Sequence, residues 1–117
     1  MSDTSPREWR FYVDDMIRFA TKVLTYTRGF TQMAFVSNAI VYDATLRNLE
    51  LIGEAATKIP DTVRTARPGI PWRQIIATRN RLIHGYLGID DDTIWSIIER
   101  DIPALLAELQ VLKDDPA

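Results

Sequence analysis

The chain holds a single histidine, His84, and an arginine, Arg79, stands five residues before it. Histidine titrates near neutral pH and can take a proton from a hydroxyl group. The fixed charge of arginine can stabilise a phosphate on which negative charge builds up. Together these residue types suit cleavage of RNA through its 2′-hydroxyl group without a metal ion. The alternative is that His84 is an ordinary surface or core residue, as most lone histidines are.

Helical geometry limits how these side chains can cooperate. If the segment is a helix, Asn80 lies four residues before His84 on the same face and could orient the imidazole. Five residues turn an α-helix by about 140°, so Arg79 and His84 would not share a face. They would converge only if the helix unwound toward Gly85, or if a second subunit contributed to the site.

Basic side chains are concentrated around this motif. Residues 62–89 carry five basic side chains and no acidic one, whereas residues 90–117 carry two basic and eight acidic side chains. All five basic residues are arginines, namely Arg64, Arg67, Arg73, Arg79 and Arg81. An arginine can contact a phosphate group through two hydrogen bonds. The formal net charge of −2 argues against a general nucleic-acid coat. The alternative is a solvated basic surface that the acidic C-terminal segment balances.

Two further side chains near the motif have open interpretations. Tyr86 follows Gly85, and its ring either packs the end of a bundle with the hydroxyl group in water or presents that hydroxyl for chemistry. Glu54 follows Gly53 in the middle of a predicted helix, where glycine costs about 1 kcal/mol relative to alanine. A close contact with another helix would explain the glycine. The Glu54 carboxylate is either exposed or turned inward to hold an arginine, and the sequence favours exposure.

Composition excludes several classes of protein and site. The chain has no cysteine, so it has neither disulfides nor thiolate metal sites, and one histidine is too few for a zinc site. We therefore expect no metal and no cofactor. No apolar run reaches the roughly 18 residues that span a bilayer, and the N-terminus lacks the features of a secretory signal. These observations predict a cytoplasmic protein with a single domain over residues 1–117, in which residues 1–6 and 113–117 are flexible.

The apolar pattern predicts the elements that position the motif. Apolar residues recur at helical spacing, and no segment shows the alternation of apolar and polar residues that is typical of a strand. Helices are expected over residues 7–28, from residue 37 or 38 to 58, from Pro71 to about Gly85, and from an N-cap among residues 90–92 onward. Thr31 should cap one short turn, residues 60–71 should form a loop, and Pro103 should kink or split the last helix. The fold class is all-α, an antiparallel bundle of four to five helices.

The order of several short segments resembles that of the HepT toxins, which belong to the HEPN ribonuclease superfamily. The resemblance spans nearly the whole chain, and its motif is R-x4-H-x-Y. It rests on Ile52-Gly53-Glu54-Ala55, Ile70-Pro71-Trp72, the motif residues Arg79, His84 and Tyr86, Gly88-Ile89-Asp90, and the helix around Trp95.

This resemblance implies a metal-independent endoribonuclease that cuts RNA, tRNA in some members, and a homodimer with the active cleft at its interface. Arg79 and His84 would be catalytic, and the supporting residues would be Asn80, Arg81 and Glu54. The resemblance further implies a type VII toxin–antitoxin system, in which a nucleotidyltransferase antitoxin of the MntA type silences the toxin by adenylylating Tyr86.

Residue count gives an independent reason to expect a dimer. Cleavage by transesterification needs a base and then an acid, and one imidazole must serve twice unless two act together. A two-fold dimer that apposes the two motifs would supply a second His84 and a second set of motif arginines. The alternative function is a non-catalytic HEPN helical module that binds a nucleotidyltransferase partner or nucleotides. Such a scaffold should tolerate alanine at position 84.

Overall fold

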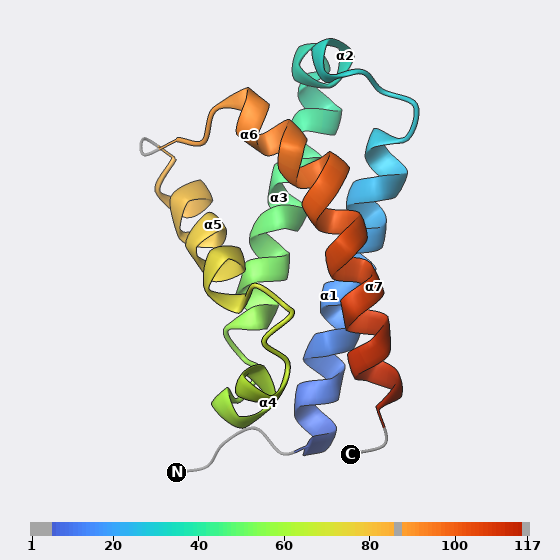
Figure 1. Cartoon of the computed structure of the whole chain (residues 1–117). Helices are drawn as coiled ribbons and strands as arrows, with labels where there is room; N and C mark the ends of the chain where they lie inside the picture. Colours follow the sequence, from blue (N-terminus) through green and yellow to red (C-terminus); the bar gives the residue numbers. More distant parts are fainter. Residues whose placement is uncertain (1–5, 86–87, 116–117) are drawn as a thin grey trace.

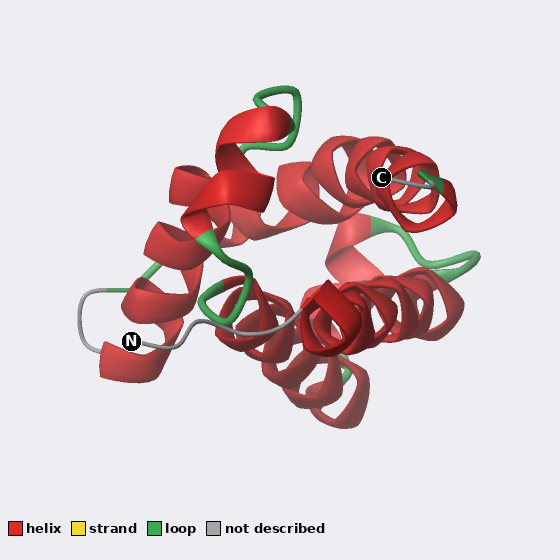
Figure 2. Ribbon diagram, turned by 90° about the horizontal axis from the view of Figure 1, so that it is seen from below, coloured by secondary structure: helices red, strands yellow, loops and turns green. Residues whose placement is uncertain are grey.

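The computed structural model describes residues 6–85 and 88–115, and in these residues every regular element is a helix (Figure 2). The long helices are α1 (Pro6–Thr27), α3 (Ala39–Ala56), α5 (Trp72–His84) and α7 (Ile102–Asp114), and the short ones are α2 (Gln32–Ser37), α4 (Asp61–Ala66) and α6 (Asp91–Ser96). Neighbouring long helices run antiparallel, and α3 lies between α1 and α5 (Figure 1). The prediction of an all-α antiparallel bundle is confirmed.

The first helix boundaries follow from turn and cap chemistry. Gly29 has a φ of 80°, a backbone conformation that glycine adopts readily just past a helix. Thr31 Oγ1 accepts a hydrogen bond from the backbone N–H of Ala34 at 3.1 Å, which confirms the predicted cap of α2. Asn38 Oδ1 accepts one from the N–H of Val41 at 3.0 Å, so Asn38 is the residue that starts α3.

The core lies where α1, α3 and α7 meet. Its buried side chains recur at helical spacing and include Val13, Met16, Ala20 and Val23 of α1, Leu49, Ile52 and Ala56 of α3, and Ile102, Leu105, Leu109 and Leu112 of α7. Two apolar side chains of the predicted long helices are nevertheless exposed, Ile40 by 82% and Ile83 by 51%. Each lies next to the end of its helix, beyond the part that packs on a neighbour.

The segment predicted as a loop, residues 60–71, contains the short helix α4, so that prediction is wrong for Asp61–Ala66. Pro60 precedes the helix as its N-cap, and α4 buries none of its side chains. Three prolines and a glycine within twelve residues obscured a helix of under two turns, which carries no apolar stripe. The indole Nε1 of Trp72 donates to the carbonyl oxygen of Arg67 at 3.1 Å and ties the end of this segment to α5.

The last helix is interrupted where proline predicted a break. Asp90 Oδ1 accepts a hydrogen bond from the N–H of Thr93 at 2.8 Å and starts α6. A π-helical segment, η1 (Ile97–Asp101), then separates α6 from α7. Pro103 lacks an N–H group and cannot continue a regular α-helical ladder, and a wide turn just before it accommodates the mismatch.

The last described residues of the chain contact α1 through hydrogen bonds and an ion pair. Arg10 donates hydrogen bonds to the carbonyl oxygens of Lys113 at 3.1 Å and Asp115 at 2.9 Å. Lys113 forms an ion pair with Asp14 at 3.2 Å, and Arg67 forms one with Asp115. Within the described residues, no helix is both long enough and apolar enough to cross a membrane.

Candidate active site

The motif residues lie on α5 and just beyond it. Pro71 is the N-cap of α5 rather than part of its first turn, and Gly85 ends the helix with a φ of 66°. The N–H of Gly85 donates to the carbonyl oxygen of Arg81 at 3.2 Å. His84 is therefore the last helical residue, and its side chain is exposed. The predicted adenylylation site, Tyr86, lies outside the described residues.

Gly53 allows α5 to approach α3 very closely. A Cβ atom at position 53 would collide with the Cβ of Arg79 and lie 2.9 Å from its Cγ. The carbonyl oxygen of Ile75 would lie only 3.1 Å from the same atom. The close helix contact that explains a glycine inside a helix is thus present, and it occurs where the last turn of α3 meets a predicted catalytic residue.

Arg79 is held by two side chains from different elements. Its Nε and Nη2 donate to Glu54 Oε1 at 3.1 and 2.6 Å, and its Nη1 donates to Asn80 Oδ1 at 2.8 Å. The Glu54 side chain is 48% exposed, and that of Arg79 is 26% exposed. Both interpretations of Glu54 therefore apply, because its carboxylate holds an arginine while it remains open to solvent.

Arg79 keeps two N–H donors that could bind a ligand. A guanidinium group has five N–H donors, of which Glu54 and Asn80 occupy three. One N–H group stays available on each terminal nitrogen, which matches two oxygens of one phosphate group. Asn80 was predicted to orient His84, and its amide oxygen has a role in holding Arg79 that the sequence did not suggest.

Arg81 is bound to the chain beyond the end of the helix. Its Nη2 donates to the carbonyl oxygen of Gly88 at 2.8 Å, although the residue is exposed. Its charge also contributes to a lowered pKa of Asp90, whose main cause is the hydrogen bond from the backbone N–H of Thr93. Arg81 thus positions the segment after the motif, a partner that spacing along the sequence could not reveal.

The structure does not bring Arg79 and His84 onto one face of α5. The helix continues through His84, so the unwinding that could have joined them is absent there. Arg79 points toward α3 and binds Glu54, and an offset of about 140° separates it from His84 around the helix. Within one chain, Arg79 and His84 therefore lie on different faces of α5.

Among the described residues, no group of three or more histidine, aspartate or glutamate side chains gathers in a way that could hold a metal ion. The groups around Arg79 are instead the carboxylate of Glu54 and the amide of Asn80, which hold its guanidinium group. A guanidinium group held in this way suits the binding of a phosphate group.

A family model described as ribonuclease HepT-like matches residues 16–112, a span that contains the contact between α3 and α5 and the end of α5. The chain belongs to the HepT-like ribonuclease family. This finding confirms the predicted resemblance and the predicted enzyme class, a ribonuclease.

Individual HepT-like relatives align along most of their length. The protein named "Putative RNase MJ1380" of Methanocaldococcus jannaschii is 32% identical over 108 residues, which cover 92% of this chain and 99% of that protein. "Probable ribonuclease HepT" of Thermococcus cleftensis is 32% identical over 107 residues, which cover 92% and 97%. "Putative RNase TTE0752" of Caldanaerobacter subterraneus is 31% identical over 96 residues, which cover 82% and 86%. No solved structure matches this HepT-like chain.

Proposed function

We propose that this HepT-like ribonuclease is a metal-independent endoribonuclease toxin that acts in the cytoplasm through Arg79 and His84. The observation that supports this proposal most directly is the double support of Arg79. Glu54 and Asn80 fix its guanidinium group and leave two N–H donors for a phosphate. A preorganised donor pair of this kind stabilises a developing phosphorane without a cost of reorganisation.

His84 would supply the proton transfers. Its imidazole takes the proton of an RNA 2′-hydroxyl group, and the 2′ oxygen then attacks the adjacent phosphorus. The bond from phosphorus to the 5′ oxygen breaks, and the imidazolium returns a proton to that leaving oxygen. The products are a cyclic 2′,3′-phosphate and a free 5′-hydroxyl group, so atoms and charges balance without a further reactant.

We propose that the site is completed across a homodimer. His84 is exposed at the end of α5 and does not share a face with Arg79 in its own chain. A two-fold axis near this end would bring His84 of one protomer to the guanidinium group of the other. The dimer would also double the arginine charge around one RNA backbone.

Control of the toxin would act at Tyr86, which follows the helix end. We propose that a cognate nucleotidyltransferase antitoxin transfers an adenylyl group to its hydroxyl oxygen, as in type VII systems. The added phosphate is negative and would occupy the arginines that otherwise bind the RNA backbone. Such control needs no change of fold.

Expression of the chain alone in bacteria, combined with RNA cleavage by the purified protein, tests the proposed function. Wild type should arrest growth and cut RNA, also in the presence of EDTA. His84→Ala and Arg79→Ala should each lower the cleavage rate by about 10²–10⁴ while circular dichroism keeps its helical signal. Arg100→Ala, which changes an exposed arginine of η1, is the matched control and should cut normally.

Cleavage by His84→Ala at the wild-type rate would contradict the assignment of the site. An absence of cleavage by the wild type would instead favour a helical module that binds without cutting. Loss of cleavage in EDTA would contradict the metal-independent mechanism.

A further inference from the structure

We propose that Arg64 and Arg73 form a distal phosphate-binding site, which holds the backbone of single-stranded RNA several nucleotides away from the bond that is cut. The site extends the proposed ribonuclease function and rests on it. It consists of a stripe along α5 and a hollow between α4 and the beginning of α5.

The stripe is set by helical spacing. Arg73, Ala77, Asn80 and His84 follow one another at intervals of four, three and four residues, and all four are exposed. Two residues that are eleven positions apart on an α-helix point in directions that differ by about 20°, and they are separated by about 16 Å along the axis. Arg73 and His84 therefore lie on one outward line, with the small side chain of Ala77 between them.

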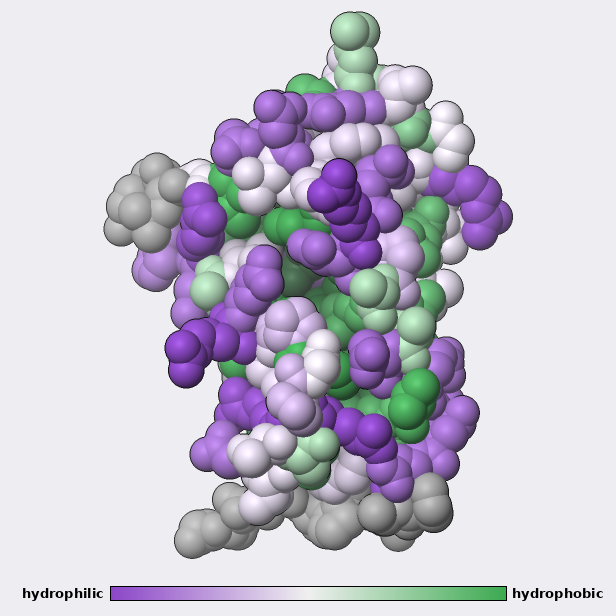
Figure 3. Space-filling model, in the orientation of Figure 1, coloured by the Kyte–Doolittle hydropathy of each residue, from purple (hydrophilic) through white to green (hydrophobic). Residues whose placement is uncertain are grey.

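The position of α5 leaves this line open. In the described part of the protein, α5 packs mainly on α3, and it forms the outer edge of the bundle (Figure 1). The stripe is opposite Ile75, which is half-buried and packs against the core. The other side of α5 borders an apolar hollow over α3 toward α7 (Figure 3), lined among others by Ile52, Ile75 and Leu105, which does not suit a charged backbone.

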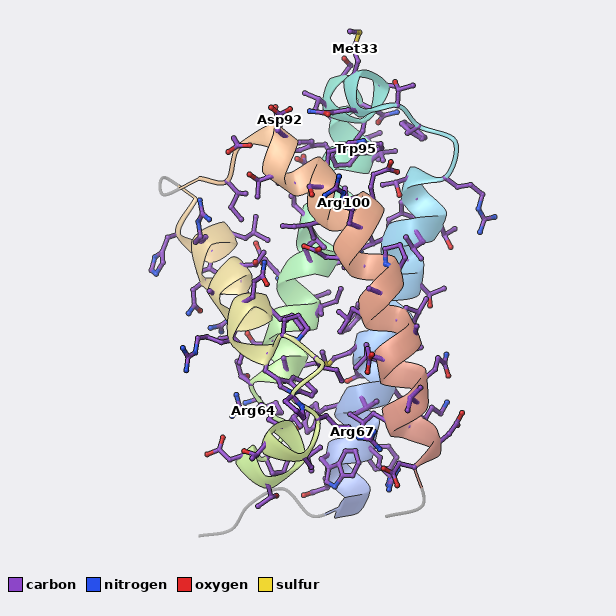
Figure 4. The ribbon with its side chains drawn as sticks, viewed as in Figure 1. Met33, Arg64, Arg67, Asp92, Trp95 and Arg100 are labelled. Atoms are coloured by element: carbon purple, nitrogen blue, oxygen red, sulfur yellow. The ribbon has the colours of Figure 1, made fainter. Side chains whose placement is uncertain are left out.

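A second arginine reaches the far end of the stripe from α4. Arg64 and Arg73 both line a surface hollow of about 360 Å³, together with Thr65, Trp72 and Asp61. Figure 4 shows Arg64 above α4, toward the beginning of α5. Two arginines and a threonine thus line one surface hollow beside the ion pair of Arg64 with Asp61, and guanidinium and hydroxyl groups are donors that a phosphate group prefers.

Both arginines keep donors available. Arg73 makes no hydrogen bond or ion pair with another residue that the structure describes, and its side chain is exposed. The Nε of Arg64 is buried and, within the described residues, has no hydrogen-bond partner, so the donors that a phosphate can reach are those on its terminal nitrogens. Arg64 Nη2 pairs with Asp61 at 2.9 Å, but the Asp61 side chain is 91% exposed, so solvent screens this pair and a phosphate can compete with it.

The length of the stripe determines how long an RNA must be to reach the distal site. An RNA whose scissile phosphate lies at His84 must extend several nucleotides along α5 before its backbone reaches Arg73. A fragment of about three nucleotides would occupy the catalytic end alone, whereas a strand of about twelve nucleotides would reach both ends, because Arg73 lies about 16 Å from His84 along the axis of α5.

Binding of fluorescently labelled single-stranded RNA to the His84→Ala protein tests the site without cleavage. For a strand of about twelve nucleotides, adding Arg64→Ala or Arg73→Ala should weaken binding similarly for different sequences. It should also lower the salt dependence of log K by about 0.7 for each lost contact. Binding of a fragment of about three nucleotides should not change. Arg73→Lys should keep the salt dependence, because the charge remains.

Arg18→Ala is the matched control. Arg18 forms the same kind of ion pair as Arg64, with an aspartate three residues before it, but it lies on α1, which has no extensive contact with α5. Unchanged affinity and salt dependence in both test variants would overturn the distal site, as would an absence of binding to the longer strand. If the variants lose salt dependence but the wild type cuts no RNA, the distal site stands and the catalytic proposal fails.

Discussion

Glu54 binds Arg79 through a single carboxylate oxygen, which accepts hydrogen bonds from Nε at 3.1 Å and from Nη2 at 2.6 Å. The bond joins the last turn of α3 to α5, and it orients the guanidinium group rather than neutralising a buried charge, since both groups contact solvent. Glu54 is therefore proposed as a positioning residue, which acts on RNA only through Arg79.

Two replacements of Glu54 distinguish its role in orienting Arg79 from the effect of its negative charge. Glu54→Gln keeps an oxygen acceptor and should lower kcat by less than about tenfold, whereas Glu54→Ala should lower kcat further and leave KM nearly unchanged. Steady-state cleavage of a defined RNA measures both constants. A rise in activity of Glu54→Ala would mean that the carboxylate competes with RNA for Arg79, and the positioning role would be wrong.

Gly53 should tolerate no side chain. Gly53→Ala gains about 1 kcal/mol of helix propensity, but it places a methyl group against the Cβ of Arg79, where overpacking costs about 1–3 kcal/mol. We expect lower stability in urea and reduced cleavage, because α5 must move away from Glu54. The control is Gly69→Ala, whose added Cβ would lie 3.6 Å from Glu108 Oε1, an ordinary contact. Equal stability and activity of the two variants would contradict the close approach of the helices.

Asp90 should give the stability of the protein a dependence on acid pH. The hydrogen bond from the backbone N–H of Thr93 lowers the pKa of Asp90 below its usual value of 3.8. A lowered folded-state pKa contributes stability that is fully present above the unfolded value and is lost as pH falls through the folded value. Asp90→Ala should therefore lower Tm near neutral pH, and its difference from wild type should shrink below about pH 3.8. Asp114→Ala serves as the control, and a difference that persists undiminished at pH 2 would contradict the assignment.

Tyr86→Phe should keep the toxicity of the protein but prevent its neutralisation by adenylylation. The variant keeps the ring but lacks the acceptor oxygen, so it should remain toxic when co-expressed with the cognate nucleotidyltransferase. Wild type should gain the mass of one or more AMP groups on the peptide that contains Tyr86, and growth should recover. Mass spectrometry that places the adduct on another residue, or finds none in a neutralised complex, would reject this mechanism.

The purified protein should be a dimer. Light scattering at micromolar concentration should give about twice the chain mass of 13.4 kDa. Mixing inactive Arg79→Ala with inactive His84→Ala should restore part of the cleavage, because a mixed dimer would hold one complete site. A monomer, or no recovery after subunit exchange, would count against a site shared between protomers.

The sequence predicted the long helices because their apolar side chains recur with the helical period over many turns, as Val13, Met16 and Ala20 do in α1. It also located the close helix contact at Gly53, since a glycine in a helix interior needs a reason. It could not reveal α4, which buries no side chain and so carries no apolar pattern. Contacts such as that of Arg81 with the carbonyl oxygen of Gly88 depend on tertiary geometry and leave no signal in residue spacing.

The uneven burial of α5 bears on how the protein responds to heat. Trp72, at its first turn, is the one residue of this helix that is buried, and the motif lies at the opposite end. Helices with few buried contacts open locally at a lower free energy than the core of the same domain. Warming should therefore release the end of α5 while α1, α3 and α7 remain packed, so catalysis would be lost reversibly below the melting temperature of the bundle. Amide hydrogen exchange should be fastest in the last turns of this helix.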